Sequence, residues 1–332
     1  MSTLVTGGAG YIGSHMVLNL ADAGEEVAVI DNLSTGFQWA VHPSAHLYQG
    51  DIADEALLDK VIRDHRVTSI IHFAGSIVVP ESLADPLKYY FNNTANSRTL
   101  IERAVKGGVE NFIFSSTAAV YGMPDADMVD EDAVLKPISP YGTSKLMTEW
   151  MLRDTAHAHG LKYAALRYFN VAGADARGRT GQSTASATHL IKVASQAALG
   201  LRSHIEVYGQ DYPTRDGTCI RDYIHVADLA NAHSAALAHL RTGGESFVAN
   251  CGYGKGFSVN EVLASVERVS GKSFDIRHGS RRPGDPARLV SNPARLKSLV
   301  DWKPAYEDLD TIVAHALAWE DRLTRTHRND AE

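Results

Sequence analysis

The spacing of three glycines near the N-terminus constrains the fold of this chain more than any other feature. Gly7, Gly10 and Gly13 lie between an apolar pair, Leu4 and Val5, and a helical pattern over residues 11–23. Glycine permits a tight turn and keeps a Cβ out of the path of a bound phosphate, whose charge a helix N-terminus attracts. The spacing therefore predicts a strand, a phosphate-binding turn and a helix, which together begin a dinucleotide-binding sheet.

The rest of the first half continues this alternation of buried strands and amphipathic helices. Further strands are expected at residues 27–30, 46–49, 69–73, 111–114 and 163–167. A helix is expected to begin near Tyr141, with Ser139 as its N-cap and Pro140 in its first position. The fold class is thus predicted to be α/β, with a Rossmann-type doubly wound parallel sheet.

The second half predicts a smaller α/β domain that is interleaved with the first. Residues 171–188 are rich in Ala, Gly, Ser and Thr and indicate a loop, whereas residues 223–230 indicate a strand that returns to the main sheet and opens a helix. A strand at 205–208, a helix at 257–269, a strand at 274–276 and a helix at 309–325 are expected as well. We assign residues 1–172 and about 222–250 to a nucleotide-binding domain, and 173–221 and 251–332 to a substrate-binding domain.

Composition excludes several classes of protein. The formal net charge is −7 and the basic residues form no run, so nucleic acid is not an expected partner. No apolar run reaches membrane-spanning length, and the chain enters a strand pattern within three residues, which leaves no room for a secretion signal. Cys219 and Cys251 cannot form a disulfide framework, and none of the 15 histidines has metal-ligand spacing. A cytoplasmic enzyme without a metal is expected.

Asp31 predicts which dinucleotide binds. It ends the second strand, 18 residues after Gly13, where a carboxylate accepts the ribose hydroxyls and repels a 2′-phosphate, so NAD is favoured over NADP. Asp51 and Ile52, after the third strand, are candidates for the adenine edge. The alternative role for Asp31 is that of a turn or cap residue.

Tyr141 and Lys145 are the candidate catalytic pair. They lie four residues apart, hence on one face of the expected helix. Tyrosine ordinarily has a pKa of about 10, which a nearby ammonium and a helix N-terminus lower. Thr117 follows the fifth strand, where its hydroxyl can bridge a substrate oxygen and Tyr141, although Ser115 and Ser116 compete for this role.

Arginines in the second half are candidates for binding a diphosphate. Arg221 is followed by Asp222, and Arg281 and Arg282 by a Pro-Gly-Asp285 turn. Two separate guanidinium groups suit a diphosphate. The alternative is a surface ion pair, which we favour for Arg281.

These motifs together resemble the extended short-chain dehydrogenase/reductase family, and within it the sugar-nucleotide 4-epimerases, over nearly the whole chain. The matching segments are Gly7–Gly13, Asp31–Ser34, Phe73–Gly75, Tyr89–Tyr90, Asn92–Asn93, Ser115–Gly122, Ser139–Lys145, Arg167–Asn170, Asp211–Thr214, Asp216–Thr218, Arg221–His225 and Arg282–Asp285. The tyrosine–lysine pair is shared by the whole superfamily, whereas the segments from Arg167 onward are specific to the epimerases.

The resemblance implies an isomerase that interconverts UDP-galactose and UDP-glucose by transient oxidation at C4 with a tightly held NAD. It implies that Tyr141 is the general base and acid, that Thr117 orients the sugar hydroxyl, and that Lys145 holds the nicotinamide ribose and tunes Tyr141. The implied cofactor-binding residues are Gly7, Gly10, Tyr11, Ile12, Gly13, Asp31, Asn32, Ser34, Asp51, Ile52, Phe73, Ala74, Gly75, Asn92, Ser115, Tyr141, Lys145 and Phe169. The implied substrate-binding residues are Thr117, Asn170, His189, Leu190, Val207, Tyr208, Arg221, Arg282, Asp285 and Leu289.

Departures from the family pattern leave the sugar open. Ile77 replaces a lysine that some epimerases carry, and His189 replaces an asparagine. Leu289 stands where the family has a large tyrosine or a small cysteine that limits room at the sugar's 2-substituent, so UDP-N-acetylhexosamines are an alternative substrate, as are UDP-pentoses and UDP-uronates.

The sequence also bears on two alternative functions and on the oligomeric state. Sugar-nucleotide dehydratases need an acidic pair after the threonine, where this chain has Ala118 and Ala119. A non-catalytic NAD sensor would have no use for Tyr141 and Lys145 together. The resemblance implies a homodimer, with residues 86–106 and 141–159 as the candidate interface helices.

Overall fold

The computed structural model describes residues 2–184, 188–282 and 284–329. Its main sheet has seven parallel strands in the order β10-β6-β5-β4-β1-β2-β3. Their bounds are β1 Ser2–Thr6, β2 Glu26–Asp31, β3 His46–Gln49, β4 Val67–His72, β5 Asn111–Thr117, β6 Lys162–Tyr168 and β10 Phe247–Cys251. The strand order reverses between β1 and β4, and ligands of doubly wound sheets bind at the carboxyl ends of the strands at such a reversal.

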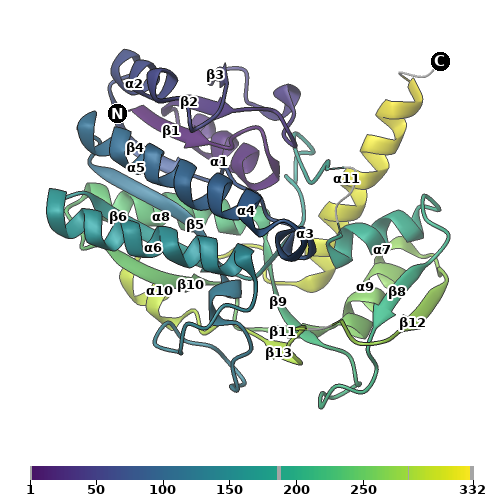
Figure 1. Ribbon diagram of the computed structural model, residues 1–332. Helices are drawn as coiled ribbons and strands as arrows, with labels where there is room; N and C mark the ends of the chain where they lie inside the picture. The colour runs from purple at the N-terminus through teal and green to yellow at the C-terminus, as the bar shows by residue number, and fades with distance from the viewer. Residues whose placement is uncertain (1, 185–187, 283, 330–332) are drawn as a thin grey trace.

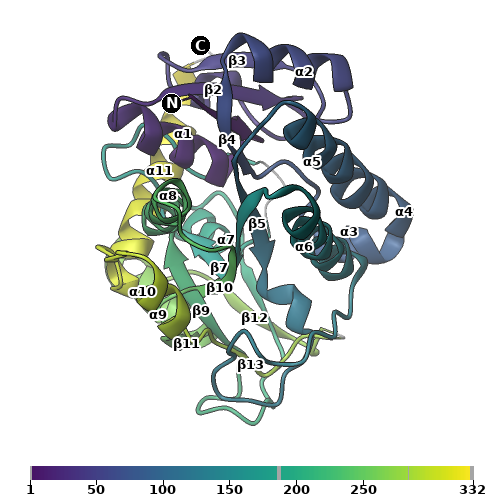
Figure 2. The same ribbon diagram turned by 90° about the vertical axis from the view of Figure 1, so that its left-hand side faces the viewer.

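Helices cover both faces of this sheet, which confirms the predicted fold class. Figure 2 shows α1 (Tyr11–Asp22) and α8 (Val226–Arg241) on one side, and α2 (Glu55–Asp64), α5 (Asn96–Lys106) and α6 (Pro140–His159) on the other. Successive side chains of a strand point to opposite faces. Val5 and Ile113 therefore pack in the core beneath α1 and α8, whereas Leu4 and Phe112 pack in the core beneath α2 and α5.

The N-terminus of α6 forms as the sequence predicts. Ser139 is the N-cap, its hydroxyl accepts a hydrogen bond from the Gly142 amide at 3.2 Å, and Pro140 follows. The helix ends at Gly160, which adopts the left-handed conformation with a φ of 73°. The cap fixes where the first turn of α6, and with it Tyr141, begins.

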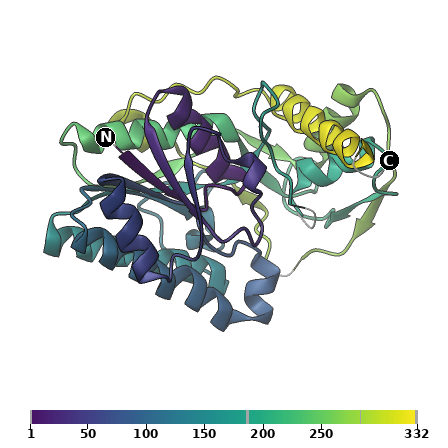
Figure 3. The same cartoon turned by 90° about the horizontal axis from the view of Figure 1, so that it is seen from above.

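A smaller lobe lies beside the carboxyl edge of the main sheet (Figures 1 and 3). Its strands pair as β12 (Ile276–Gly279) with β8 (Ile205–Tyr208), and as β7 (Asn170–Ala172), β11 (Gly256–Ser258) and β13 (Arg288–Leu289) with β9 (Ile220–His225). Its helices are α7 (Leu190–Ala198), α9 (Val259–Ser270) and α11 (Leu309–Asn329). One apolar core runs from the α1 and α8 face of the main sheet into this lobe.

The remaining elements are short and lie at loops and edges. Three of them link β4 to α5: α3 (Val79–Ala84), α4 (Pro86–Tyr89) and the π-helical turn η2 (Tyr90–Ala95). The others are η1 (Gln38–Ala40), η3 (Ala118–Tyr121) and α10 (Ala294–Leu299).

Three strand predictions are wrong in detail. The strand expected to return to the main sheet is β9, which pairs with β7, β11 and β13 instead, and β10 is the strand that joins the main sheet beside β6. All six residues of β9 are buried, so its sequence looks like that of a main-sheet strand, and only tertiary contacts select its partners. Residues 170–172, which overlap the predicted loop, form β7, and the strand predicted at 274–276 lies at Ile276–Gly279. The predicted domain bounds stay a prediction.

The longest helices are α6 with 20 residues and α11 with 21. Both carry charged residues along their length. Within the ranges that the structure describes, no helix is both long and apolar enough to cross a bilayer.

Candidate active site

The glycine turn after β1 closes against two neighbours. Gly7 has a φ of 72°, and a Cβ there would lie 2.6 Å from the amide nitrogen of Ala74. A Cβ on Gly13 would lie 2.1 Å from the carbonyl oxygen of Gly7. Gly10 is the N-cap of α1 and has no side chain, so the amides of Tyr11 and the next residues remain available to a phosphate. This cradle fits a dinucleotide pyrophosphate.

Asp31 lies at the mouth of this turn, at the end of β2. Its carboxylate accepts hydrogen bonds from the amides of Ala9, at 2.9 Å, and Leu33, at 2.8 Å, and the residue is 8% exposed. Each carboxylate oxygen keeps a lone pair, which suits two ribose hydroxyls. Asn32 donates to the carboxylate of Asp51 at 3.0 Å, which brings the two predicted nucleotide loops together.

Of the other residues predicted to bind the nucleotide, Ser34 lies in the loop cluster and Ile52 lies in the core. Ser34 donates its amide to the side chain of Asn32 at 3.1 Å, so it belongs to the same loop cluster. Ile52 is 5% exposed and packs in the core beneath α2.

A third loop, after β4, connects the glycine turn to the catalytic helix. The amides of Phe73 and Ala74 both donate to the carbonyl oxygen of Thr6, at 2.9 and 3.1 Å. A Cβ on Gly75 would lie 2.9 Å from the side-chain oxygen of Asn93 and 3.8 Å from Nζ of Lys145. Lys145 therefore lies beside the same loop that closes the glycine turn.

The predicted cofactor residue Asn92 lies next to a more deeply buried asparagine, Asn93. Asn93 is 2% exposed, accepts a hydrogen bond from the amide of Ser76 at 2.7 Å and donates to the hydroxyl of Ser144 at 3.1 Å. Asn92 is only half-buried and donates to the hydroxyl of Ser76 at 2.8 Å. Both lie in the π-helical turn, which shifts the facing of side chains relative to an α-helix. The adjacent asparagines were the available signal, but the pattern alone does not say which one faces inward.

Thr117 is the hydroxyl of its segment that is directed to Tyr141. The Ser115 hydroxyl contacts that of Tyr168, and the Ser116 hydroxyl donates to Glu149. Thr117 ends β5, and its hydrogen bond to Tyr141 lowers the pKa of that phenol. The two serines therefore no longer compete for the role.

Burial controls the protonation of the catalytic pair. It raises the pKa of Tyr141 above its ordinary value despite the bond from Thr117, and it lowers the pKa of Lys145 to about 8. Nζ of Lys145 donates to the carbonyl oxygen of Ser115 at 3.0 Å and lies 5.0 Å from the centre of the Phe114 ring. The expected lowering of the Tyr141 pKa by Lys145 is not found in this arrangement, because the ammonium is directed to the strand.

A buried ion pair connects α6, which carries Tyr141 and Lys145, to β6 of the main sheet. Arg167 on β6 and Glu149 on α6 are 2.6 Å apart, and both side chains are 4% exposed. The hydroxyl of Ser116 donates a further hydrogen bond to the Glu149 carboxylate. The pair thus fixes α6 relative to β5 and β6.

The predicted diphosphate residues lie on β9 and in the segment between β12 and β13. Arg221 forms an ion pair with Asp285 and is the register partner of Leu289. The guanidinium of Arg282 lies 3.8 Å from the centre of the Tyr208 ring. Arg281, in contrast, pairs with Asp211 at 2.7 Å, as expected for a surface ion pair.

A second group of predicted substrate residues lines a small cavity beside β7. Asn170, His189 and Leu190 all border it. Burial lowers the pKa of His189, whose Nδ1 lies 2.7 Å from the side-chain nitrogen of Gln182. Val207 is not part of this group, because its side chain is 1% exposed and packs in the core.

Leu289 and Phe169 lie close to the catalytic residues. Both pack against a cluster that contains Ala118, the residue after Thr117, and Leu146, the residue after Lys145. Leu289 therefore packs against residues that adjoin Thr117 and Lys145 in the chain. Over the described part of the chain, no group of three His, Cys, Asp or Glu residues forms a candidate metal site.

The chain is similar in sequence to a known protein family and to its members. Residues 3–252 match the model of the NAD dependent epimerase/dehydratase family. A UDP-glucose 4-epimerase of Azospirillum brasilense is 56% identical over 323 residues, which are 97% of this chain and 93% of the relative.

Solved structures agree over nearly the same length. The UDP-glucose 4-epimerase of Brucella ovis in complex with NAD superposes with a TM-score of 0.93 at 44% identity, covering 96% of this chain and 98% of that one. The UDP-Glc/GlcNAc 4-epimerase of Campylobacter jejuni superposes with a TM-score of 0.85 at 45% identity, covering 97% and 99%.

The lowered pKa of Lys145 predicts a specific pH dependence of stability. Between about pH 8 and its ordinary value of 10.5, folded Lys145 has lost its proton while the unfolded chain keeps it, so stability rises with pH through this window. Lys145→Met removes the penalty of the buried ammonium. The variant should therefore exceed the wild type in free energy of unfolding most at pH 7, and by less at pH 10, in urea denaturation of nucleotide-free protein. Lys272→Met, at an exposed site, is the control, and an equal difference for Lys145→Met at both pH values would contradict the assignment.

Proposed function

Because the chain belongs to the NAD dependent epimerase/dehydratase family, we propose that it is an NAD-dependent UDP-glucose 4-epimerase that interconverts UDP-galactose and UDP-glucose. The observation that carries the proposal is the meeting of Thr117, Tyr141 and Lys145 beside the glycine turn, opposite the Arg221 and Asp285 pair. A dinucleotide cradle, a proton-transfer group and a diphosphate site thus share one edge of the sheet.

Tyr141 is the residue that moves the proton of the sugar 4-hydroxyl. Bound NAD supplies the hydride acceptor and donor at C4. Tyr141 takes the hydroxyl proton as a base and returns it as an acid after the 4-keto sugar has presented its other face. Thr117, hydrogen-bonded to Tyr141, orients the same hydroxyl.

Lys145 acts from the cofactor side of the site. Its ammonium lies 3.8 Å from the position of a Cβ on Gly75 and is held by the Ser115 carbonyl. We assign it the nicotinamide ribose, and its charge then favours the Tyr141 phenolate through that ribose hydroxyl. Burial raises the pKa of Tyr141 in the protein alone, so we assign its activation to the charges and hydroxyl groups that NAD and substrate would bring.

The smaller lobe holds the nucleotide half of the substrate. Arg221 and Arg282 reach the site from different elements, and two guanidinium groups match the two phosphates of UDP. Asn170, His189 and Leu190 border the adjoining cavity and complete the contacts that we assign to UDP-sugar.

Dehydration of the sugar is disfavoured by the residues next to Thr117. A dehydratase needs an acid there to expel water, whereas Ala118 is 3% exposed and apolar. Neither Ala118 nor Ala119 offers the acid that loss of water from the sugar would need.

Tyr141→Phe tests the assigned base. The loss of the hydroxyl should lower kcat by about 10²–10⁴-fold, because proton transfer in the transition state is removed, while bound NAD is retained. The measurement is turnover of UDP-galactose together with the NAD content of the purified variant. Tyr163→Phe, a buried tyrosine of β6, is the matched control, and an unchanged kcat in Tyr141→Phe would remove Tyr141 from the mechanism.

Substrate range tests the space left by Leu289. We expect the purified protein, without added cofactor, to convert UDP-galactose to an equilibrium mixture with its 4-epimer, and also UDP-N-acetylgalactosamine, as separated by chromatography. The similarity to an epimerase described as acting on both Glc and GlcNAc nucleotides supports this wider range.

Leu289→Tyr is the matching variant for this experiment. The larger ring should reduce turnover of UDP-N-acetylgalactosamine at least about tenfold relative to UDP-galactose, the discrimination that a steric change in a pocket supplies. Equal losses on both substrates would mean that Leu289 does not border the 2-substituent. Conversion of neither substrate by the wild type, even with NAD supplied, would redirect the proposal to UDP-pentoses or UDP-uronates.

We also propose a homodimer through the outer faces of the α4–α5 segment and α6, which lie side by side in Figures 1 and 2. Four large apolar side chains are exposed on these elements: Leu87 at 77%, Phe91 at 64%, Trp150 at 44% and Met147 at 36%. An apolar patch of this kind marks a protein interface.

Trp150→Glu tests this interface. A buried, unpaired carboxylate opposes association, so the variant should elute as a monomer while the wild type elutes as a dimer, with masses from light scattering. Leu201→Glu, an equally exposed apolar residue of the smaller lobe, is the control. A wild-type monomer, or a dimer that persists in Trp150→Glu, would contradict the assignment.

A further inference from the structure

Residues 173–181 form a compact hairpin between β7 and α7. Ala174 and Gly181 form an antiparallel bridge, and the amide of Asp175 donates to the carbonyl oxygen of Thr180 at 3.0 Å. The Asp175 carboxylate accepts two bonds from the Arg179 guanidinium, at 2.9 and 3.0 Å. The hairpin is thus closed by its own ion pair and presents Arg179 in a fixed orientation.

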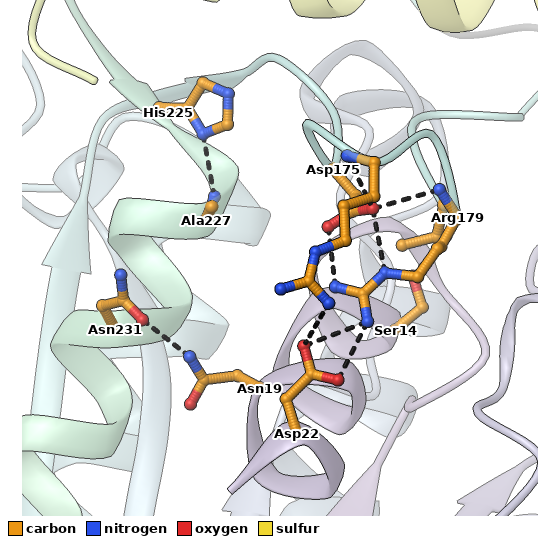
Figure 4. A network of polar contacts seen from close by, with 10 residues as sticks. Ser14, Asn19, Asp22, Asp175, Arg179, His225, Ala227 and Asn231 are labelled. Atoms are coloured by element: carbon orange, nitrogen blue, oxygen red, sulfur yellow. Dashed lines mark hydrogen bonds and ion pairs between the residues drawn. The ribbon is translucent and has the colours of Figure 1, made fainter. Parts of the chain in front are cut away.

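The hairpin is fastened to one face of α1 at three points. The hydroxyl of Tyr11 donates to the carbonyl oxygen of Gly173 at 2.7 Å. The hydroxyls of Ser14 and Thr180 are 2.9 Å apart. The guanidinium of Arg179 donates to both carboxylate oxygens of Asp22, at 2.9 and 3.0 Å (Figure 4).

These contacts run along the whole length of α1. Tyr11 is its first residue, Ser14 lies in its first turn and Asp22 is its last residue. A carboxylate is disfavoured at a helix C-terminus by the helix dipole. Arg179 offsets this effect, and its hydrogen bond lowers the pKa of Asp22.

Aromatic side chains connect the hairpin to the loop on the other side of the glycine turn. The amide of Phe37 donates to the carbonyl oxygen of Ala9 at 2.9 Å, and Trp39 lies 5.9 Å from Trp319 on α11. A Cβ on Gly181 would lie 2.4 Å from the ring of Trp319. These contacts form a closed circuit. The glycine turn contacts the loop after β2, that loop contacts α11, α11 contacts the hairpin, and the hairpin contacts Tyr11.

We propose that residues 173–181 are a clasp that retains NAD, with Arg179 as its positioning residue. The clasp holds Tyr11, whose amide borders the pyrophosphate cradle, and joins it to the lobe that carries the substrate residues. Release of the dinucleotide requires this circuit of contacts to open. The inference rests on the proposed use of NAD and adds a group that touches neither NAD nor the sugar.

The experiment measures exchange of bound NAD in the holoenzyme. Purified protein is mixed with an excess of isotopically labelled NAD, and the bound fraction is followed by mass spectrometry. Arg179→Ala should exchange NAD about three- to tenfold faster than the wild type, the range expected for a partly exposed bidentate ion pair. Its kcat with saturating NAD should stay within about twofold of the wild type, because Arg179 contacts no reacting group.

Matched variants separate a clasp from a general loss of structure. Arg179→Lys keeps the charge without the planar fork and should exchange at an intermediate rate. Thr180→Val removes the bond to Ser14 with little change in volume and should also accelerate exchange. Arg268→Ala breaks the exposed ion pair with Asp310 between α9 and α11 and should exchange at the wild-type rate.

A double-mutant cycle and salt dependence identify the contact. Asp22→Ala and Arg179→Ala act on the same pair, and Asp22 also lies 3.9 Å from Arg177. Asp22→Ala should therefore accelerate exchange less in the Arg179→Ala background than in the wild type. Added salt should accelerate exchange in the wild type and not in Arg179→Ala.

Two outcomes overturn the clasp, and a third overturns more than the clasp. Exchange at the wild-type rate in Arg179→Ala, or equal acceleration by Arg268→Ala, means that the hairpin does not retain NAD. Protein that neither carries nor binds NAD refutes both the clasp and the proposed function. Bound NAD without epimerisation refutes only the proposed reaction, since the exchange rates still decide the clasp.

Discussion

The close approach between Gly13 and the carbonyl of Gly7 is the contact on which the rest of the site depends. A Cβ at Gly13 would stand 2.1 Å from that oxygen, so any other residue would push α1 away from β1. With α1 in place, its N-terminus faces the cradle, Ala9 reaches Asp31, and one face of the helix meets the 173–181 hairpin. The dinucleotide loop, the ribose carboxylate and the clasp are therefore positioned by a single backbone contact.

Burial gives the catalytic pair its character. The same apolar surroundings raise the pKa of Tyr141 and lower that of Lys145 to about 8, so in the protein alone each residue is biased toward its neutral form. A buried phenol with a raised pKa is a weak base until charges and hydroxyl groups enter beside it. The acid–base chemistry then depends on a filled site, which suits an enzyme whose cofactor is to stay bound through both halves of the reaction.

Much of the fold could be predicted from local patterns, whereas the partners of the strands could not. The glycine turn, the N-cap at Ser139 and the strands of the first half follow from short-range sequence periodicity. β9 was predicted in the wrong sheet, and β7 was predicted as loop, because the residues of a buried strand do not specify which strand it pairs with. Asn92 stays a prediction, because a π-helical turn, which the sequence does not announce, decides how Asn92 and Asn93 face.

Local sequence patterns were enough to predict the chemistry: a glycine turn for a phosphate, a carboxylate 18 residues later, and a tyrosine and a lysine on one helix face. These rest on spacings within one or two elements, where backbone geometry leaves little choice. Other contacts follow only from the packing of the fold: the hydroxyl that reaches Tyr141, the hydrogen bond of Lys145 to the Ser115 carbonyl, and the ion pair of Arg179 with Asp22 across 157 positions of the chain. Such contacts depend on how separate elements pack, and the energy of packing is shared among residues too distant in sequence for any local pattern to record.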